Sequence, residues 1–283
     1  GSRLPYPHSS GGPCAWPVAP GGSAGAMALS SRSLFADRPI DTGPHAMIRL
    51  SEIKLPLAAA QSPDAALHAA AAQTLGIAPE AIAQVHVFKR SFDARKAELL
   101  AVYILDITLA DATQEAALLA RHAGNVHIQP TPDMAWRPVG QAPATLAQRP
   151  VVVGFGPCGI FAALVLAQMG FKPIVIERGK AVRERTQDTW GLWRQRQLNP
   201  ESNVQFGEGG AGTFSDGKLY SQIKDPRHLG RKVLQEFVDA GAPPEILYAA
   251  HPHIGTFRLV KMVENMRAHI IALGGEVRFA QRV

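Results

Sequence analysis

The sequence has little cysteine and no long apolar run, and each absence excludes a class of protein. Only two of its 283 residues are cysteines, Cys14 and Cys158, so a disulfide scaffold is excluded, and this usage is typical of a reducing cytoplasm. No apolar run approaches the roughly twenty residues of a membrane-spanning helix. The N-terminus also lacks the charged start and continuous apolar stretch of a signal peptide. We therefore expect a cytoplasmic protein with no membrane partner.

The composition favours a folded enzyme of two domains over a nucleic-acid-binding protein. A chain of 283 residues with 46% hydrophobic content can bury a large core. The net charge of +6 is compatible with nucleic-acid binding, but the sequence has no RNA-recognition signature and no basic helix with interleaved aromatic residues. We therefore expect phosphate-bearing small molecules, and no nucleic acid, as ligands.

The chain divides into four segments by composition. Residues 1–46 are rich in Gly, Pro, Ser and Ala and lack periodicity, which predicts a disordered N-terminal extension. This segment is either upstream of the working protein or a genuine flexible arm. In residues 47–130 the patterns of strands and helices follow the order β-α-β-β-α-β, which predicts a small α+β ferredoxin-like domain. Residues 131–149 are punctuated by proline and predict a linker to a domain at 150–283.

The stretch VVVGFGPCG opens this last domain and carries a phosphate-binding pattern. Three valines predict a strand that is buried on both sides. Gly154, Gly156 and Gly159 then fit G-x-G-x-x-G, in which the second glycine lets the backbone approach a pyrophosphate. An apolar helix follows, and the next strand, PIVIE, ends in Glu177, where this motif has an acid for the ribose hydroxyls. The pattern predicts a dinucleotide site, and NAD and FAD both remain open.

A second glycine-rich run, GEGGAGTFSDGKL, begins at Gly207. With this run and the motifs VVVGFGPCGIFAALVLAQMG, IVIERG and HPHIGTFRL, residues 47–283 resemble the two-dinucleotide-binding-domain flavoproteins, most closely a bacterial family of FAD-dependent dehydrogenases. The resemblance implies a Rossmann-like FAD-binding domain in an α/β fold, with FAD as the cofactor and NAD(P)H as a possible electron donor. It also implies that the chain is the N-terminal part of a larger enzyme, with the FAD-binding domain truncated at its C-terminus and the fragment inactive by itself.

The motifs and the resemblance together imply a set of cofactor contacts. Arg178 is expected beside the adenosine, Arg183 or Arg185 near the pyrophosphate, and Val283 at the adenine. Thr213, Ser215 and Asp216 of the second glycine run offer side-chain hydrogen bonds. The predicted cofactor-binding residues are Gly154, Gly156, Pro157, Cys158, Gly159, Glu177, Arg178, Arg185, Gly209, Gly210, Gly212, Thr213, Ser215, Asp216 and Val283.

No motif identifies a catalytic residue, a substrate or a metal site. His251 and His253 alternate on a possible strand, but no Cys or acid stands near them at a ligand spacing. The resulting hypothesis is an FAD-dependent oxidoreductase in which the flavin carries the redox chemistry. Two alternatives stay open: a protein with a structural or redox-sensing flavin that acts through a partner, and an NAD-dependent dehydrogenase.

Overall fold

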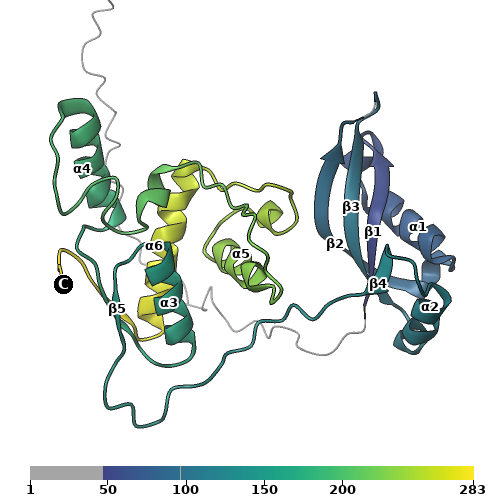
Figure 1. Ribbon diagram of the computed structural model, residues 1–283, viewed down its shortest axis with the longest axis horizontal. Coiled ribbons are helices and arrows are strands. Elements are labelled where there is room, and N and C mark those ends of the chain that lie inside the picture. The colour runs from purple at the N-terminus through teal and green to yellow at the C-terminus, as the bar shows by residue number, and fades with distance from the viewer. Residues whose placement is uncertain (1–46, 96) are drawn as a thin grey trace, which may run out of the picture. The chain divides into compact units, whose positions relative to one another are not determined.

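The computed structural model describes residues 47–95 and 97–283 (Figure 1). The prediction of a disordered extension at residues 1–46, together with Cys14, lies outside the described residues. The described chain is a mixed α/β protein with two sheets, one antiparallel and one parallel. In the described ranges, no helix is long and apolar enough to cross a bilayer.

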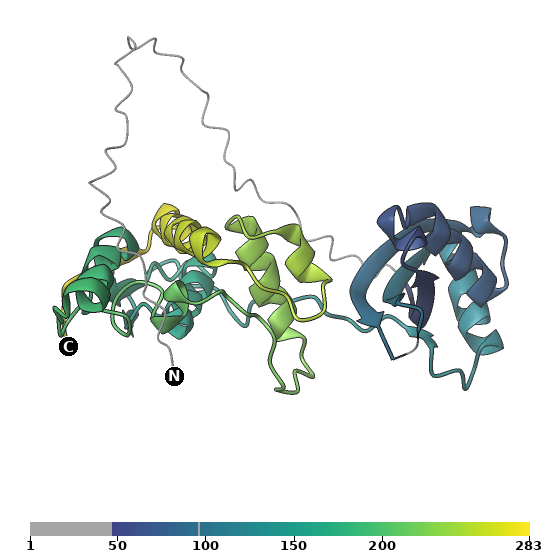
Figure 2. The same cartoon turned by 90° about the horizontal axis from the view of Figure 1, so that it is seen from above.

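The antiparallel sheet has four strands in the order β2-β3-β1-β4. Its elements follow one another as the sequence predicts, strand, helix, strand, strand, helix and strand. Figures 1 and 2 show both helices on the same face of this sheet. The elements are β1 (Ile48–Pro56), α1 (Asp64–Leu75), β2 (Ile82–Asp93), β3 (Leu100–Leu109), α2 (Glu115–Arg121) and β4 (Ile128–Pro130).

Alternate apolar residues of β1 and β3 form the core beneath these helices. Ile48 and Leu50 of β1 are fully buried against Leu105 and Ile107 of β3, because side chains two residues apart share one face of a strand. Leu67 of α1 completes the cluster. Helix α1 ends at Gly76, which adopts the left-handed conformation and donates its N–H to the carbonyls of the last turn.

The opposite face of the antiparallel sheet contains a buried ion pair. Asp106 is almost fully buried and accepts two hydrogen bonds from Arg49, one from Nε at 2.7 Å and one from Nη2 at 2.8 Å. Thr131 donates a further hydrogen bond to the same carboxylate at 3.1 Å. This paired geometry satisfies a charge that would otherwise be costly to bury.

The parallel sheet has three short strands in the order β5-β6-β7. Helices α3 and α6 pack side by side against it (Figure 1), with Leu164, Val175 and Met266 in their common core. Residues 131–149, which precede the sheet, contain no helix or strand. The elements are β5 (Val151–Val153), α3 (Pro157–Gln168), β6 (Ile174–Ile176), α4 (Val182–Gln195), α5 (Leu229–Asp239), α6 (Thr256–Ala272) and β7 (Glu276–Arg278).

The prediction that the valine run is buried on both sides is wrong. Val152 packs against the core beneath α3 and α6, whereas Val151 and Val153 are 56% and 67% exposed. The pleat of β5 turns these two side chains to the other face of the sheet. That face is therefore open to solvent at β5.

The buried carboxylate of Asp106 generates a stability prediction. Asp106→Asn keeps the shape of the side chain but leaves the guanidinium of Arg49 without a counter-charge, so we expect a loss of about 3 kcal/mol in the free energy of unfolding. Chemical denaturation checks this value. Asp133→Asn is the matched control, because Asp133 and its partner Arg137 are both well exposed and their pair should add almost nothing. Equal stability of the two variants would contradict the prediction.

Candidate functional site

The turn between β5 and α3 brings the first glycine motif to the carboxyl end of the parallel sheet. Gly154 has φ of +90° and donates its N–H to Ile176 of β6 at 2.8 Å, so the turn starts with a conformation that suits glycine. A Cβ on Gly159 would lie 1.9 Å from the carbonyl oxygen of Gly154. The first turn of α3 therefore packs directly on the glycine turn, as the spacing of the motif predicts.

Glu177 follows β6 and connects this turn to the next loop. The residue is 5% exposed. One carboxylate oxygen accepts the N–H of Phe155 at 2.6 Å, and the other accepts the N–H of Gly179 at 2.8 Å. Hydrogen bonds to a carboxylate are stronger than neutral ones, so Glu177 fixes two backbone segments relative to each other.

The second glycine segment, residues 207–217, lies against the first. Gly209 donates its N–H to the carbonyl of Phe155 at 2.8 Å. Gly210 has φ of +63°, and a Cβ there would lie 3.2 Å from Cα of Gly156. Two glycine-rich segments that are some fifty residues apart in the sequence thus meet backbone to backbone.

A cavity of about 380 Å³ lies where these segments meet. Its wall includes Val153 and Ile176, the last residues of β5 and β6, so the cavity opens at the carboxyl ends of parallel strands. Six predicted site residues line it: Gly154, Gly156, Glu177, Arg178, Gly210 and Val283. Gln205, Phe206, Gly207, Gln281 and Arg282 also line it and were not predicted.

The guanidinium of Arg178 contacts an aromatic ring and a carboxylate. It stacks on the ring of Phe206 with 3.9 Å between Cζ and the ring centroid, and it donates to Glu201 at 2.9 Å. Glu201 also accepts from Arg282 at 3.2 Å. The aromatic residue just before the second glycine run was the available sequence signal for this wall of the cavity.

The remaining predicted residues do not line the cavity. Pro157, Cys158 and Gly159 form the first turn of α3, with Cys158 exposed. Gly212 and Thr213 belong to a short 3-10 helix, Ala211–Phe214, which follows Gly209 and Gly210. Ser215 donates to the carbonyl of Gly212 at 2.7 Å, Thr213 is buried, and Asp216 forms an exposed pair with Lys218.

Arg185 has a structural position, in contrast to the prediction that it approaches a pyrophosphate. Its side chain is fully buried, and its guanidinium donates to the carbonyls of four residues, Asn203, Val204, Gly207 and Glu208. Burial lowers the pKa of Arg185 to about 10, although the nearby charges of Glu177 and Glu208 oppose this shift. Because its donors bind these carbonyls, Arg185 fixes the backbone conformation of residues 203–208, where the second glycine segment begins.

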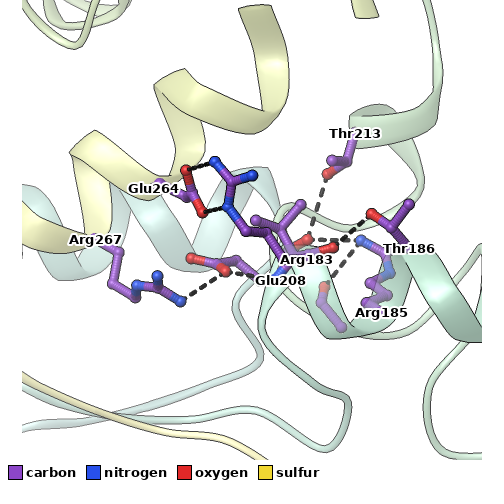
Figure 3. Close-up of polar contacts among 9 residues, drawn as sticks. Arg183, Arg185, Thr186, Glu208, Thr213, Glu264 and Arg267 are labelled. Atoms are coloured by element: carbon purple, nitrogen blue, oxygen red, sulfur yellow. Dashed lines mark hydrogen bonds and ion pairs between the residues drawn. The ribbon is translucent and has the colours of Figure 1, made fainter. Parts of the chain in front are cut away.

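Glu208 is a buried acid that the sequence analysis missed. Figure 3 shows it between α4 and α6, where it accepts the N–H of Val182 at 2.7 Å and pairs with Arg267 at 2.9 Å. Burial raises the pKa of its carboxyl, against the opposing effects of the Val182 hydrogen bond and the charge of Arg267. Nearby, an ion pair joins Arg183 of α4 to Glu264 of α6. Arg183, the other arginine predicted near the pyrophosphate, is therefore paired with a carboxylate.

In the described ranges, no group of three or more His, Cys, Asp and Glu side chains is placed to hold a metal ion. The arrangement instead offers a glycine-lined cavity, a helix N-terminus beside it and one buried carboxylate in its wall. Such a set can bind phosphate and hydroxyl groups.

Comparison with known proteins gives no activity. Residues 47–108 match a family model described as a domain of unknown function, DUF8436. An uncharacterized protein of Clostridium beijerinckii is 44% identical over 211 residues, which is 74% of this chain and 38% of that protein. The chain thus spans well under half the length of this relative. The assignment to a family of FAD-dependent dehydrogenases is corrected by these matches, because the matching family has no known function and the relative has no assigned activity.

The position of Glu177 generates a second stability prediction. Glu177→Ala leaves the N–H groups of Phe155 and Gly179 without their acceptor, so we expect a loss of about 3 kcal/mol in the free energy of unfolding. Chemical denaturation of the ligand-free chain measures it. Glu201→Ala is the control: this acid is 41% exposed and should change stability little. If Glu177→Ala were as stable as the native chain, the carboxylate would not be holding the turn.

Proposed function

We propose that the cavity at the carboxyl ends of β5 and β6 binds the adenosine diphosphate part of a dinucleotide, and that the protein is an FAD-dependent oxidoreductase of the cytoplasm. The observation that carries the proposal is the meeting of two glycine segments and a buried carboxylate in the wall of one cavity. Ligands of open parallel sheets bind in this position, outside the carboxyl ends of the strands. When bound, a flavin supplies hydride or single-electron chemistry.

The steric surroundings of Gly156 support a ligand at this point. Gly159 is required by the fold, since a side chain there would collide with the turn. Gly156 is different: its φ is −76°, and a Cβ would have as its nearest neighbour Cα of Gly210 at 3.8 Å, an ordinary contact. The protein alone therefore has room for a Cβ at Gly156. A phosphate group that approaches this backbone gives a reason for the missing side chain.

The first turn of α3 and Glu177 provide complementary groups for the ligand. The first N–H groups of a helix have no partner within the helix and favour an anion, and α3 begins at Pro157, directly after the cavity residue Gly156. Each carboxylate oxygen of Glu177 accepts one backbone N–H, and each can accept a second hydrogen bond. We expect the phosphates beside α3 and the ribose hydroxyls beside Glu177.

The finer fold classes are part of the same proposal. The three parallel strands with α3 and α6 are consistent with part of a Rossmann-like FAD-binding domain. The β2-β3-β1-β4 sheet with α1 and α2 is consistent with a ferredoxin-like domain.

FAD is favoured because the second glycine segment extends the binding surface beyond the glycine turn. An NAD-dependent dehydrogenase and a protein with a structural or redox-sensing flavin remain the alternatives. Visible absorption of the protein after incubation with FAD, followed by addition of NADH or NADPH, distinguishes the three. An NAD-dependent enzyme acquires no yellow cofactor, a structural flavin is not reduced in turnover, and an oxidoreductase flavin is reduced and then reoxidised by an acceptor.

Gly156→Val tests the site itself. We expect this variant to fold with a melting temperature near that of the native chain but to bind ADP and FAD about a hundredfold more weakly or not at all, because the added side chain occupies the space of the phosphates. Calorimetric titration measures the affinity. Gly140→Val is the control, since a Cβ at Gly140 meets nothing within 4 Å. Native ADP affinity in folded Gly156→Val would refute the assignment.

A further inference from the structure

Glu208 is the one polar residue in the first part of the second glycine segment, residues 207–212, where the other residues are glycine or alanine. Residues 207–212 read GEGGAG, so four glycines and one alanine surround it. This segment carries the close contacts of the cavity, from Gly209 to Phe155 and from Gly210 to Gly156. A glycine chain has more conformational freedom to lose than any other, so its position must be fixed from outside.

The carboxylate of Glu208 connects that segment to two helices. Its Oε2 accepts the N–H of Val182, the first residue of α4, and also accepts from Nη1 of Arg267 on α6. A carboxylate at a helix N-terminus is favourable, because it satisfies a free N–H and faces the positive end of the helix dipole. The side chains labelled in Figure 3 come from α4, α6 and the second glycine segment.

Burying the carboxylate of Glu208 costs folding free energy, which indicates that its contacts with α4 and α6 serve a purpose other than stability. The residue is fully buried, and its Oε1 has no hydrogen-bond partner among the described residues. A buried, partly unsatisfied carboxylate is unfavourable for folding alone. An apolar side chain would fill the same volume without this cost, but it could not accept the N–H of Val182 or pair with Arg267.

We propose that Glu208 is a positioning residue for the cofactor cavity. Its carboxylate anchors the second glycine segment to the first turn of α4 and to α6, and so holds Gly207 and Gly210 in the wall of the cavity. This inference rests on the proposed function in so far as the cavity binds a dinucleotide. The anchoring itself concerns only the residues of this chain and can be measured without ligand.

Glu264 provides a matched control. It is a residue of α6, and its carboxylate accepts two hydrogen bonds from Arg183 of α4, at 2.5 Å and 2.8 Å. It has no hydrogen bond to the glycine segment among the contacts of the described residues. Removing either acid breaks a link between the helices, but only the removal of Glu208 releases the segment.

The experiment compares Glu208→Ala, Glu208→Gln and Glu264→Ala in the full chain, with ADP as the probe. We expect Glu208→Ala to weaken ADP binding about tenfold or more and to speed amide hydrogen exchange at residues 209–214. Glu208→Gln keeps an oxygen for the N–H of Val182 and should restore most of both properties. Glu264→Ala should lower the melting temperature but change neither ADP affinity nor exchange at 209–214.

Other results would contradict either the positioning role of Glu208 or the proposed function. Equal ADP affinities in Glu208→Ala and Glu264→Ala, or unchanged exchange at 209–214 in folded Glu208→Ala, would overturn the positioning role. If Glu208→Ala does not fold, Arg267→Met removes only the α6 link, and unchanged exchange at 209–214 in that variant would overturn it equally. If the native chain binds no ADP, the proposed function fails and the cofactor part of this inference fails with it, while hydrogen exchange still decides whether Glu208 anchors the segment.

Discussion

Two backbone N–H groups, one from the turn after β5 and one from the loop after β6, converge on the buried carboxylate of Glu177. The candidate site depends on this convergence. Because Phe155 is held by Glu177, its carbonyl is in place to accept the N–H of Gly209. The second glycine segment is thereby brought against Gly156, and the cavity exists only where these segments meet.

Glu177 and Glu208 act in similar ways at the two sides of the glycine contact. Each is buried, and its carboxylate accepts backbone N–H groups, two for Glu177 and one for Glu208. Glycines and backbone atoms therefore make up much of the cavity wall. The carboxylates of Glu177 and Glu208 hold this backbone in position through hydrogen bonds. Such a wall presents peptide dipoles at close range, which suits the phosphate and ribose parts common to all adenine dinucleotides.

Much of this site could be predicted from local pattern, and some of it could not. The spacing of Gly154, Gly156 and Gly159 implies a tight turn and a close helix, and the structure has both. Arg183 and Arg185 are two residues apart in one polar helix and look equivalent in the sequence. One is exposed and paired with Glu264, and the other is fully buried, because only tertiary packing decides which side of α4 faces the protein.

The exposed valines of β5 show the same limit. Three consecutive valines indicate an apolar environment, but the number of layers that cover a sheet depends on segments far away in the chain. The family assignment had a related weakness. Glycine-rich motifs report backbone geometry and phosphate binding, and these properties are shared by proteins of unrelated activity, so the motifs were informative about the cavity and misleading about the family.

Arg185 organises residues 203–208, which lead into the second glycine segment, around one charged side chain. Four carbonyl oxygens from residues 203–208 surround one guanidinium, much as oxygen ligands gather around a calcium ion in a binding loop. Displacement of this one guanidinium would remove the hydrogen-bond donor of all four carbonyls at once. The segment should therefore order or unfold as a unit, with the side chain of Arg185 serving as a permanently attached ligand that never dissociates from the chain.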